Sequence, residues 1–215
     1  MATVVKRRLV ELYRSARFEC KAFILSGISL SRVFLNKQKY YGRKIEIGAG
    51  IHSQKSDFLT IDLSIKADIP YDLKFGLPLE ANSLETIYSE HVLENFNHRD
   101  LIFLLKEYYR SLRDGGIFSC VVPDAKLYVK AYYEGRLNSI KNSSKSLTSL
   151  SYQNRIDILN HVFYMDGHHQ HMFYDDSMVD TFTSLGFKQV CVREFNEKLD
   201  RKDRKYESIY FKCIK

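Results

Sequence analysis

The segment that decides the fold reads KIEIGAGIHSQKSDFLTIDL and spans residues 44–63. KIEIG predicts a short buried strand, and FLTIDL predicts a second strand that ends at Asp62. Gly48 and Gly50 stand between the strands, where residues without side chains let the backbone turn tightly and approach a ligand. An acidic residue at the end of the second strand is typical of folds that bind a ribose. The combination predicts a nucleoside site, although the G-x-G alone is equally compatible with a plain structural turn.

The missing third glycine indicates which kind of ligand binds there. A pyrophosphate site needs a third glycine followed by the N-terminus of a helix. Here His52 and Ser53 follow the turn, and residues 51–57 leave too little room for a long helix before the second strand. The segment therefore favours a ligand without phosphates.

The rest of the chain alternates strand and helix patterns. Helical periodicity extends over 99–112 and 175–187, with the Gly115–Gly116 pair as the expected stop of the first helix. Apolar strand patterns occupy 86–88 and 116–122, and two further strands at 188–195 and 207–214 have no helix between them. We expect a mostly parallel sheet in which this last pair forms a hairpin, giving one antiparallel strand.

The basic charge is concentrated at the N-terminus. The 215-residue chain has a net charge of +7, yet residues 1–44 alone hold eleven Lys and Arg against two Glu, so the remainder is slightly acidic. We divide the chain into a basic amphipathic helical arm at 1–42 and an α/β domain at 43–215 with a variable insertion at about 125–175. The arm either packs on the domain or contacts an anionic surface, membrane or nucleic acid. No apolar run approaches the ~20 residues of a transmembrane helix, so we expect a cytoplasmic protein, membrane-peripheral if the arm binds lipid.

Several pieces in order resemble one known family. Five segments, taken in their order along the chain, are similar to the motifs of class I S-adenosylmethionine-dependent methyltransferases of the type 11 style. They are EIGAG, TIDL, ADIPYDLKFGLPLEANSLETIYSEHVLENF, LLKEYYRSLRDGGIFSCVVPD and MFYDDSMVDTFTSLGFKQVCV. The resemblance is clearest over 44–124. It implies a Rossmann-like, seven-stranded, mostly parallel sheet with an antiparallel last strand and helices on both faces, and S-adenosylmethionine as the cofactor.

The resemblance also implies roles for individual residues. Those implied for the cofactor are Gly48 and Gly50 at its methionine part, Glu46 at its amino group, Asp62 with Leu63 at the ribose, Asp72 with Leu73 at the adenine, and Ser89 beside the sulfonium. The family's common LEH reads LEN, with Asn95 in place of His, which puts in doubt any role of a histidine there but not the cofactor site.

Catalytic candidates follow from the chemistry. A sulfonium donor is already activated, so methyl transfer needs alignment first, and a hydroxyl acceptor also gains from a general base such as His. The candidates are His171, then His168, together with His91 and Asp124, which follow the fourth and fifth strands. The histidine-rich stretch 161–173 could instead be pocket lining, surface or a metal site, but its spacing matches no standard metal site, so we expect none.

The leading hypothesis is a methyltransferase acting on a small-molecule or saccharide hydroxyl. The subgroup resembled is often encoded beside surface-polysaccharide genes, which points by analogy to a glycan acceptor. The alternatives are an RNA or protein methyltransferase and a non-catalytic cofactor-binding scaffold. The slightly acidic body makes nucleic acid the less favoured partner, and the sequence does not predict an oligomeric state.

Overall fold

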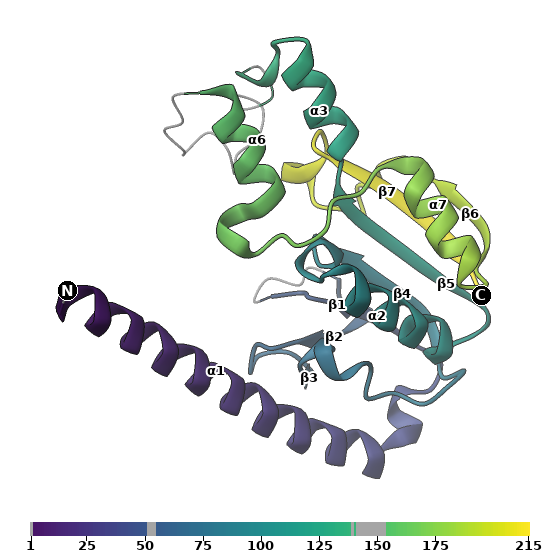
Figure 1. Cartoon of the computed structure of the whole chain (residues 1–215). Helices are drawn as coiled ribbons and strands as arrows, with labels where there is room; N and C mark the ends of the chain where they lie inside the picture. The colour runs from purple at the N-terminus through teal and green to yellow at the C-terminus, as the bar shows by residue number, and fades with distance from the viewer. Residues whose placement is uncertain (1, 51–54, 139, 141–153) are drawn as a thin grey trace.

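The protein is built on one seven-stranded sheet with the strand order β3-β2-β1-β4-β5-β7-β6 (Figure 1). The computed structural model describes residues 2–50, 55–138, 140 and 154–215, with the backbone alone for 2–9 and 11. The strands are β1 (Arg43–Ile47), β2 (Phe58–Asp62), β3 (Ile69–Pro70), β4 (Leu84–Glu90), β5 (Leu112–Pro123), β6 (Lys188–Val192) and β7 (Ser208–Ile214). β7 pairs antiparallel with both β5 and β6, and every other pair is parallel. The predicted seven-stranded, mostly parallel sheet with an antiparallel last strand and an N-terminal helix is confirmed.

The central strands form the core because their side chains are buried on both faces. Ile45, Ile87 and Phe118, which lie on adjacent strands, are almost completely shielded from solvent. Continuous apolar runs of this kind are what buried parallel strands require. The edge strand β6 differs, since most of its residues are exposed.

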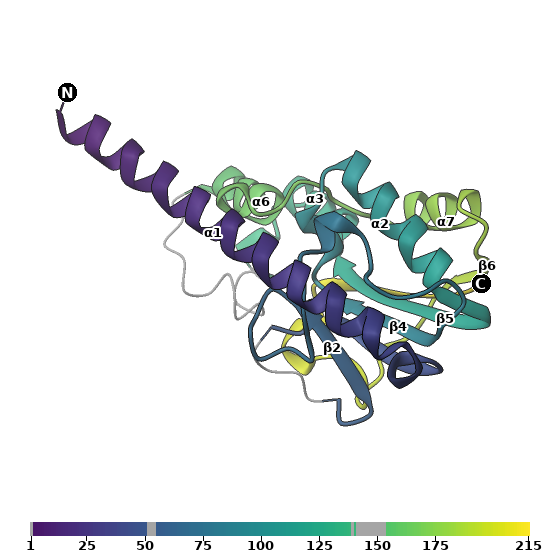
Figure 2. The same ribbon diagram turned by 90° about the horizontal axis from the view of Figure 1, so that it is seen from below.

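Two helices lie on one face of the sheet, α2 (His98–Ser111) and α7 (Asp175–Ser184) (Figures 1 and 2). Their aromatic side chains contact the strands edge-on: Tyr108 of α2 and Phe182 of α7 both pack against Phe118. α2 ends at Ser111, earlier than the Gly115–Gly116 pair, because Leu112 already pairs with β4 and the two glycines lie within β5.

The opposite face of the sheet carries a second apolar cluster. Tyr88, Val121 and Tyr210 point to this side, and the segment that joins β6 to β7 covers them with Phe195 and Leu199. This segment includes the 3-10 turn η5 (Lys202–Arg204). A charged stretch that reads as a simple linker is therefore part of the packed structure.

The N-terminal arm is a single helix, α1 (Ala2–Leu35), followed by η1 (Lys37–Tyr40). Its C-terminal half packs beside β3, where Ser29 Oγ donates to the Pro70 carbonyl and Ser26 Oγ accepts from the Asp72 N–H. Its N-terminal half projects beyond the body (Figure 2). Among the described residues, no helix is both long and apolar enough to cross a bilayer.

The region after β5 contains α3 (Ala125–Tyr133), α6 (Arg155–Tyr164) and the turn η4 (Met165–Gly167). α3 and α6 share a small apolar cluster that includes Tyr128, Leu137 and Ile158. The Ser-rich part of the expected insertion, 141–153, lies outside the described residues, as do His52 and Ser53 of the opening turn.

Candidate active site

The glycine turn lies at the carboxyl end of β1, where its shape depends on the absence of a side chain. Gly48 has a φ of +67°, and a Cβ placed there would lie 2.3 Å from a methyl carbon of Val92. The Gly48 N–H donates to the Ile61 carbonyl of β2, and the Gly50 N–H donates to the Asp62 carboxylate over 3.0 Å. The turn and the acid of the neighbouring strand are thus joined directly.

Asp62 and Asp72 lie at the ends of β2 and β3. The second carboxylate oxygen of Asp62 accepts from the Ser64 N–H over 2.7 Å, so both oxygens hold backbone while the side chain stays partly accessible. Asp72 is buried and caps the turn η2 (Leu73–Phe75) by accepting from the Lys74 N–H. The two acids therefore lie at the carboxyl ends of neighbouring strands. Each is followed in the sequence by a leucine that was also predicted to contact the cofactor, Leu63 or Leu73.

Glu46 and Ser89 lie near the carboxyl ends of the adjacent central strands β1 and β4. The Glu46 carboxylate forms an ion pair of 2.5 Å with Lys55, and both side chains are only 8% exposed. Lys55 also lies over the Tyr88 ring, 4.2 Å from its centroid. Ser89, the β4 residue opposite Ile47 of β1, is buried, and its hydroxyl has no hydrogen-bond partner among the described residues. An unpaired buried hydroxyl is costly unless a ligand or water satisfies it.

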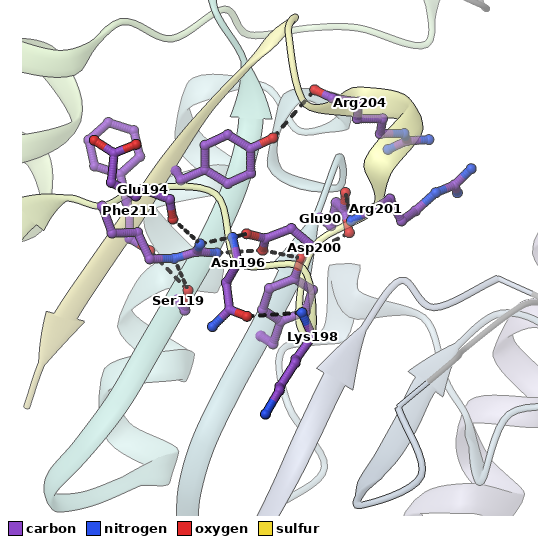
Figure 3. A network of polar contacts seen from close by, with 12 residues as sticks. Glu90, Ser119, Glu194, Asn196, Lys198, Asp200, Arg201, Arg204 and Phe211 are labelled. Carbon is purple, nitrogen blue, oxygen red and sulfur yellow. Dashed lines mark hydrogen bonds and ion pairs between the residues drawn. The ribbon is translucent and has the colours of Figure 1, made fainter.

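A buried polar network surrounds Asp200 on the side of β4 and β5 opposite α2 and α7 (Figure 3). Arg193 donates two hydrogen bonds of 2.6 Å to the Asp200 carboxylate and a third to Ser119 Oγ. Tyr88 OH lies 3.0 Å from Asp200 and 2.9 Å from Glu90, whose second oxygen accepts from the Arg201 N–H. The network fixes the segment between β6 and β7 over the carboxyl end of β4.

Next to the carboxyl end of β4, the His91 imidazole lies between the Ser208 hydroxyl of β7 and the Glu94 carboxyl. His91 Nε2 lies 2.8 Å from Ser208 Oγ, and His91 Nδ1 lies 3.3 Å from Glu94 Oε1. His91 has a φ of +54°, and its N–H donates to the Val121 carbonyl of β5. Backbone conformations of this kind cluster at functional sites.

Burial changes the proton affinities of this group. It raises the pKa of the Glu94 carboxyl to about 8, and it holds the pKa of His91 well below its usual value. The second oxygen of Glu94 has no hydrogen-bond partner among the described residues. A protonated Glu94 would donate to Nδ1 and leave the Nε2 proton facing Ser208, whereas an ionised Glu94 accepts from Nδ1 and frees Nε2 as an acceptor.

The histidine-rich segment lies beside this group. The His171 N–H donates to the Glu94 carbonyl, and its half-buried ring stacks on His98 with 5.8 Å between centroids. His169 is buried, with Nδ1 2.6 Å from the Val162 carbonyl, whereas His168 is exposed. The structure thus places His171 next to Glu94, and it leaves the His168 side chain on the surface.

Asp124 connects these elements to a cavity. It follows β5, caps α3 by accepting from the Leu127 N–H, and its own N–H donates to the Glu207 carbonyl; burial raises its pKa. A cavity of about 390 Å³ opens beside it, lined among others by Ser208, Lys126 and three aromatic side chains. The aromatic residues are Phe195, Tyr206 and Tyr210.

Sequence reasoning proposed His91 and Asp124 as candidates, but it did not name Glu94, Ser208 or Asp200, which the structure places at this end of the sheet. Glu94 follows His91 by three residues, a spacing that could have suggested contact in a helical turn. No pattern in the neighbouring sequence marks Ser208 or Asp200 as a candidate. Within the described chain, no group of three or more His, Cys, Asp or Glu side chains is arranged to hold a metal ion.

The strand order and the antiparallel β7 form a Rossmann-like, seven-stranded mixed sheet, the fold that the resemblance to class I methyltransferases implied. Neither a protein-family model nor a curated protein matches the chain. Among solved structures, a SAM-dependent methyltransferase from Archaeoglobus fulgidus is 12% identical, covering 88% of this chain and 94% of that one at a TM-score of 0.48.

Two further solved structures are similar to the chain. A SAM-dependent methyltransferase from Thermotoga maritima, described as a possible histamine N-methyltransferase, is 17% identical over 100% of both chains at a TM-score of 0.48. Phosphoethanolamine N-methyltransferase 2 of Haemonchus contortus, in complex with S-adenosyl-L-methionine, is 12% identical over 82% of this chain and 49% of that one at a TM-score of 0.46. The chain spans about half the length of this last protein. These likenesses are loose, and the fold assignment rests on the strand order.

Proposed function

We propose that the chain is an S-adenosylmethionine-dependent methyltransferase that acts on a hydroxyl of a small molecule or saccharide. The observation that carries the proposal is the contact between the glycine turn and the Asp62 carboxylate. It lies where β1 stands between β2 and β4, the point at which the strand order reverses. Ligands of open α/β sheets bind at the carboxyl ends of the strands at this switch point.

The residues at this edge fit a nucleoside with a small charged tail. Gly48 and Gly50 leave room for close approach, and the buried Ser89 hydroxyl lacks a partner among the described residues. Asp62 keeps free lone pairs for ribose hydroxyls beside its two backbone bonds, because a carboxylate has about four acceptor sites. We assign Leu63 to the ribose side and Asp72 with Leu73 to the adenine.

Glu46 is assigned to the cofactor's amino group, with Lys55 holding the carboxylate in place. The bound cofactor would supply a methyl group on an activated sulfonium, which makes alignment the main requirement. The short connection 48–57 favours this ligand over a dinucleotide, since a parallel crossover with a helix needs about a dozen residues or more.

We assign the general base to His91. Ser208 lines the cavity beside Asp124, so it can take the proton of an acceptor hydroxyl and pass its own proton to His91 Nε2. Glu94 in its ionised form would accept from Nδ1 and so stabilise the imidazolium while the acceptor oxygen takes the methyl group that the bound cofactor would supply. His171 is the second candidate base, because its ring is half-buried and its backbone N–H donates to the Glu94 carbonyl.

A saccharide suits the cavity because it combines aromatic faces with hydrogen-bonding groups. The rings of Phe195, Tyr206 and Tyr210 offer apolar surface, while Asp124 and Ser208 can bond to hydroxyls. This assignment of the acceptor class rests on the proposed chemistry of the site.

Calorimetric titration with S-adenosylmethionine tests the proposal. We expect Asp62→Ala to weaken binding by roughly 10- to 100-fold, since a hydrogen bond to a charged group contributes about 1.5–3 kcal/mol. Asp57→Ala is the matched control, because Asp57 ends the same connection, directly before β2, but is exposed and pairs with Lys44. A wild-type chain that binds neither S-adenosylmethionine nor S-adenosylhomocysteine would refute the proposal.

Turnover assays distinguish His91 from His171 as the general base, and they distinguish an enzyme from a non-catalytic scaffold. Release of S-adenosylhomocysteine is followed with a panel of monosaccharides and nucleotide sugars as acceptors. His91→Gln should lower turnover by at least about 100-fold at near-normal cofactor affinity; a loss confined to His171→Gln transfers the role to His171. Cofactor binding without turnover on any acceptor would favour the scaffold alternative.

A further inference from the structure

The inner face of α1 is fixed to the body by small side chains. Ala22, Ser26, Ser29 and Val33 are buried, and their spacing of four, three and four residues places them on one side of the helix. Ser26 and Ser29 hydrogen bond to the backbone around β3. The orientation of the helix about its own axis is therefore determined, and so is the face that it turns outward.

The outward face is apolar over a long distance. At 1.5 Å per residue the helix is roughly 50 Å long, and its N-terminal half extends past the body (Figures 1 and 2). Ile24, Ile28 and Leu35 lie opposite the buried side chains. Seven apolar residues turned outward are each at least 50% exposed: Leu12, Tyr13, Ile24, Ile28, Leu30, Phe34 and Leu35. Single exposed apolar residues are ordinary, but a row along one helix face marks an interaction surface.

One border of this face is basic. Arg14, Lys21 and Arg32 are exposed along this border, and Arg17, also exposed, lies in line with Leu35 five turns before it. Glu19, the carboxylate among the described α1 side chains, lies away from this border and reaches Lys74 of the body over 3.4 Å. An apolar face bordered by cations complements a surface that is apolar inside and anionic outside.

We propose that the outward face of α1 binds an anionic lipid surface, with the helix lying in the plane of the bilayer interface. Helices of this length with Phe, Leu and Ile on one face and Lys or Arg beside it bind this way. Lipid is the favoured partner of this face, because a nucleic acid would contact the basic residues and leave the row of apolar side chains exposed to water. A symmetric dimer through this face is less favoured, since it repeats the same basic border on both partners.

Vesicle co-sedimentation of the full-length chain tests the proposal. The wild type should sediment with phosphatidylcholine vesicles that contain phosphatidylglycerol, more than with phosphatidylcholine alone, and less so in high salt. The variant Ile24→Gln/Ile28→Gln/Leu35→Gln should reduce the partition constant at least about tenfold. The matched control Val129→Gln/Tyr133→Gln/Ile156→Gln removes three exposed apolar side chains from α3 and α6, and it should bind as the wild type does.

A second variant probes the charge separately. Arg14→Gln/Arg17→Gln/Lys21→Gln should lower binding to the anionic vesicles by on the order of 100-fold and leave binding to phosphatidylcholine unchanged. Circular dichroism and urea unfolding verify that each variant is folded.

Three results would overturn the proposal. One is a wild type that does not sediment with anionic vesicles, and another is an apolar variant that binds them as well as the wild type. The third is a dimer in sedimentation velocity that the apolar variant dissociates while vesicle binding stays absent, which would assign the face to a second copy. Loss of cofactor binding would leave this proposal standing, because the vesicle assay needs no S-adenosylmethionine.

Discussion

Replacing Gly48 by alanine tests whether the turn after β1 is shaped by steric necessity. A Cβ at this position would lie 2.3 Å from Val92 Cγ2, whereas unstrained carbon atoms stand about 3.5–4.0 Å apart. Gly50 offers a matched control in the same turn. It also has a positive φ, of +60°, but a Cβ there would meet nothing within 4 Å.

The expected cost has two parts. Placing a non-glycine residue in the left-handed region costs about 1–2 kcal/mol, and the overlap with Val92 adds about 1–3 kcal/mol of overpacking. Gly48→Ala should therefore lower the free energy of unfolding by about 3 kcal/mol, and Gly50→Ala by about 1 kcal/mol. Cofactor affinity should fall more for Gly48→Ala, because relief of the overlap requires the turn to move.

A double-mutant cycle isolates the overlap. Val92→Ala removes the methyl group that Gly48→Ala would meet, so the two substitutions together should cost about 2 kcal/mol less than the sum of the single effects. Urea unfolding gives the four free energies, and calorimetric titration with S-adenosylmethionine gives the affinities. Equal stabilities of Gly48→Ala and Gly50→Ala, or an additive cycle, would refute the steric explanation.

Two further predictions concern buried polar groups. Asp200→Asn should lower the free energy of unfolding by about 3 kcal/mol because it leaves Arg193 buried without its charge partner; Asp203→Asn, which breaks a largely exposed pair, should cost less than about 1 kcal/mol. Equal effects in urea unfolding would mean that the Asp200 network is not stabilising. Because the folded-state pKa of Glu94 is raised from 4.5 to about 8, its stabilising contribution is full below pH 4.5 and is lost progressively as the pH rises from there through about 8. Between about pH 7 and about pH 9 the free energy of unfolding of the wild type should therefore fall by about 1 kcal/mol more than that of Glu94→Gln. Parallel pH profiles of the two proteins would contradict this prediction. His91 does not contribute to the difference, because its lowered pKa keeps it neutral throughout this range.

Local patterns in the sequence predicted the main strands and helices, and they marked Asp62 and the glycine turn as candidates for the cofactor site. The apolar strand before Gly48, the acid at the end of the next strand and the helical periodicity of 99–112 are each formed by neighbouring residues, so each could be interpreted without knowing the rest of the chain. Asp62 and the glycine turn lie twelve residues apart, and parallel pairing of β1 with β2 is enough to bring them together.

The tertiary structure decided what lies on the acceptor side, because those groups come from distant parts of the chain. His91 and Ser208 are 117 residues apart, and they meet only because β7 inserts antiparallel beside β5. Tyr88 and Asp200 are 112 residues apart, in a strand and in a charged segment that resembles a linker. The direction in which α1 turns its apolar face likewise depends on which side chains the body buries. The sequence alone determines that α1 is an amphipathic helix, and packing of its small residues against β3 determines which face stays open.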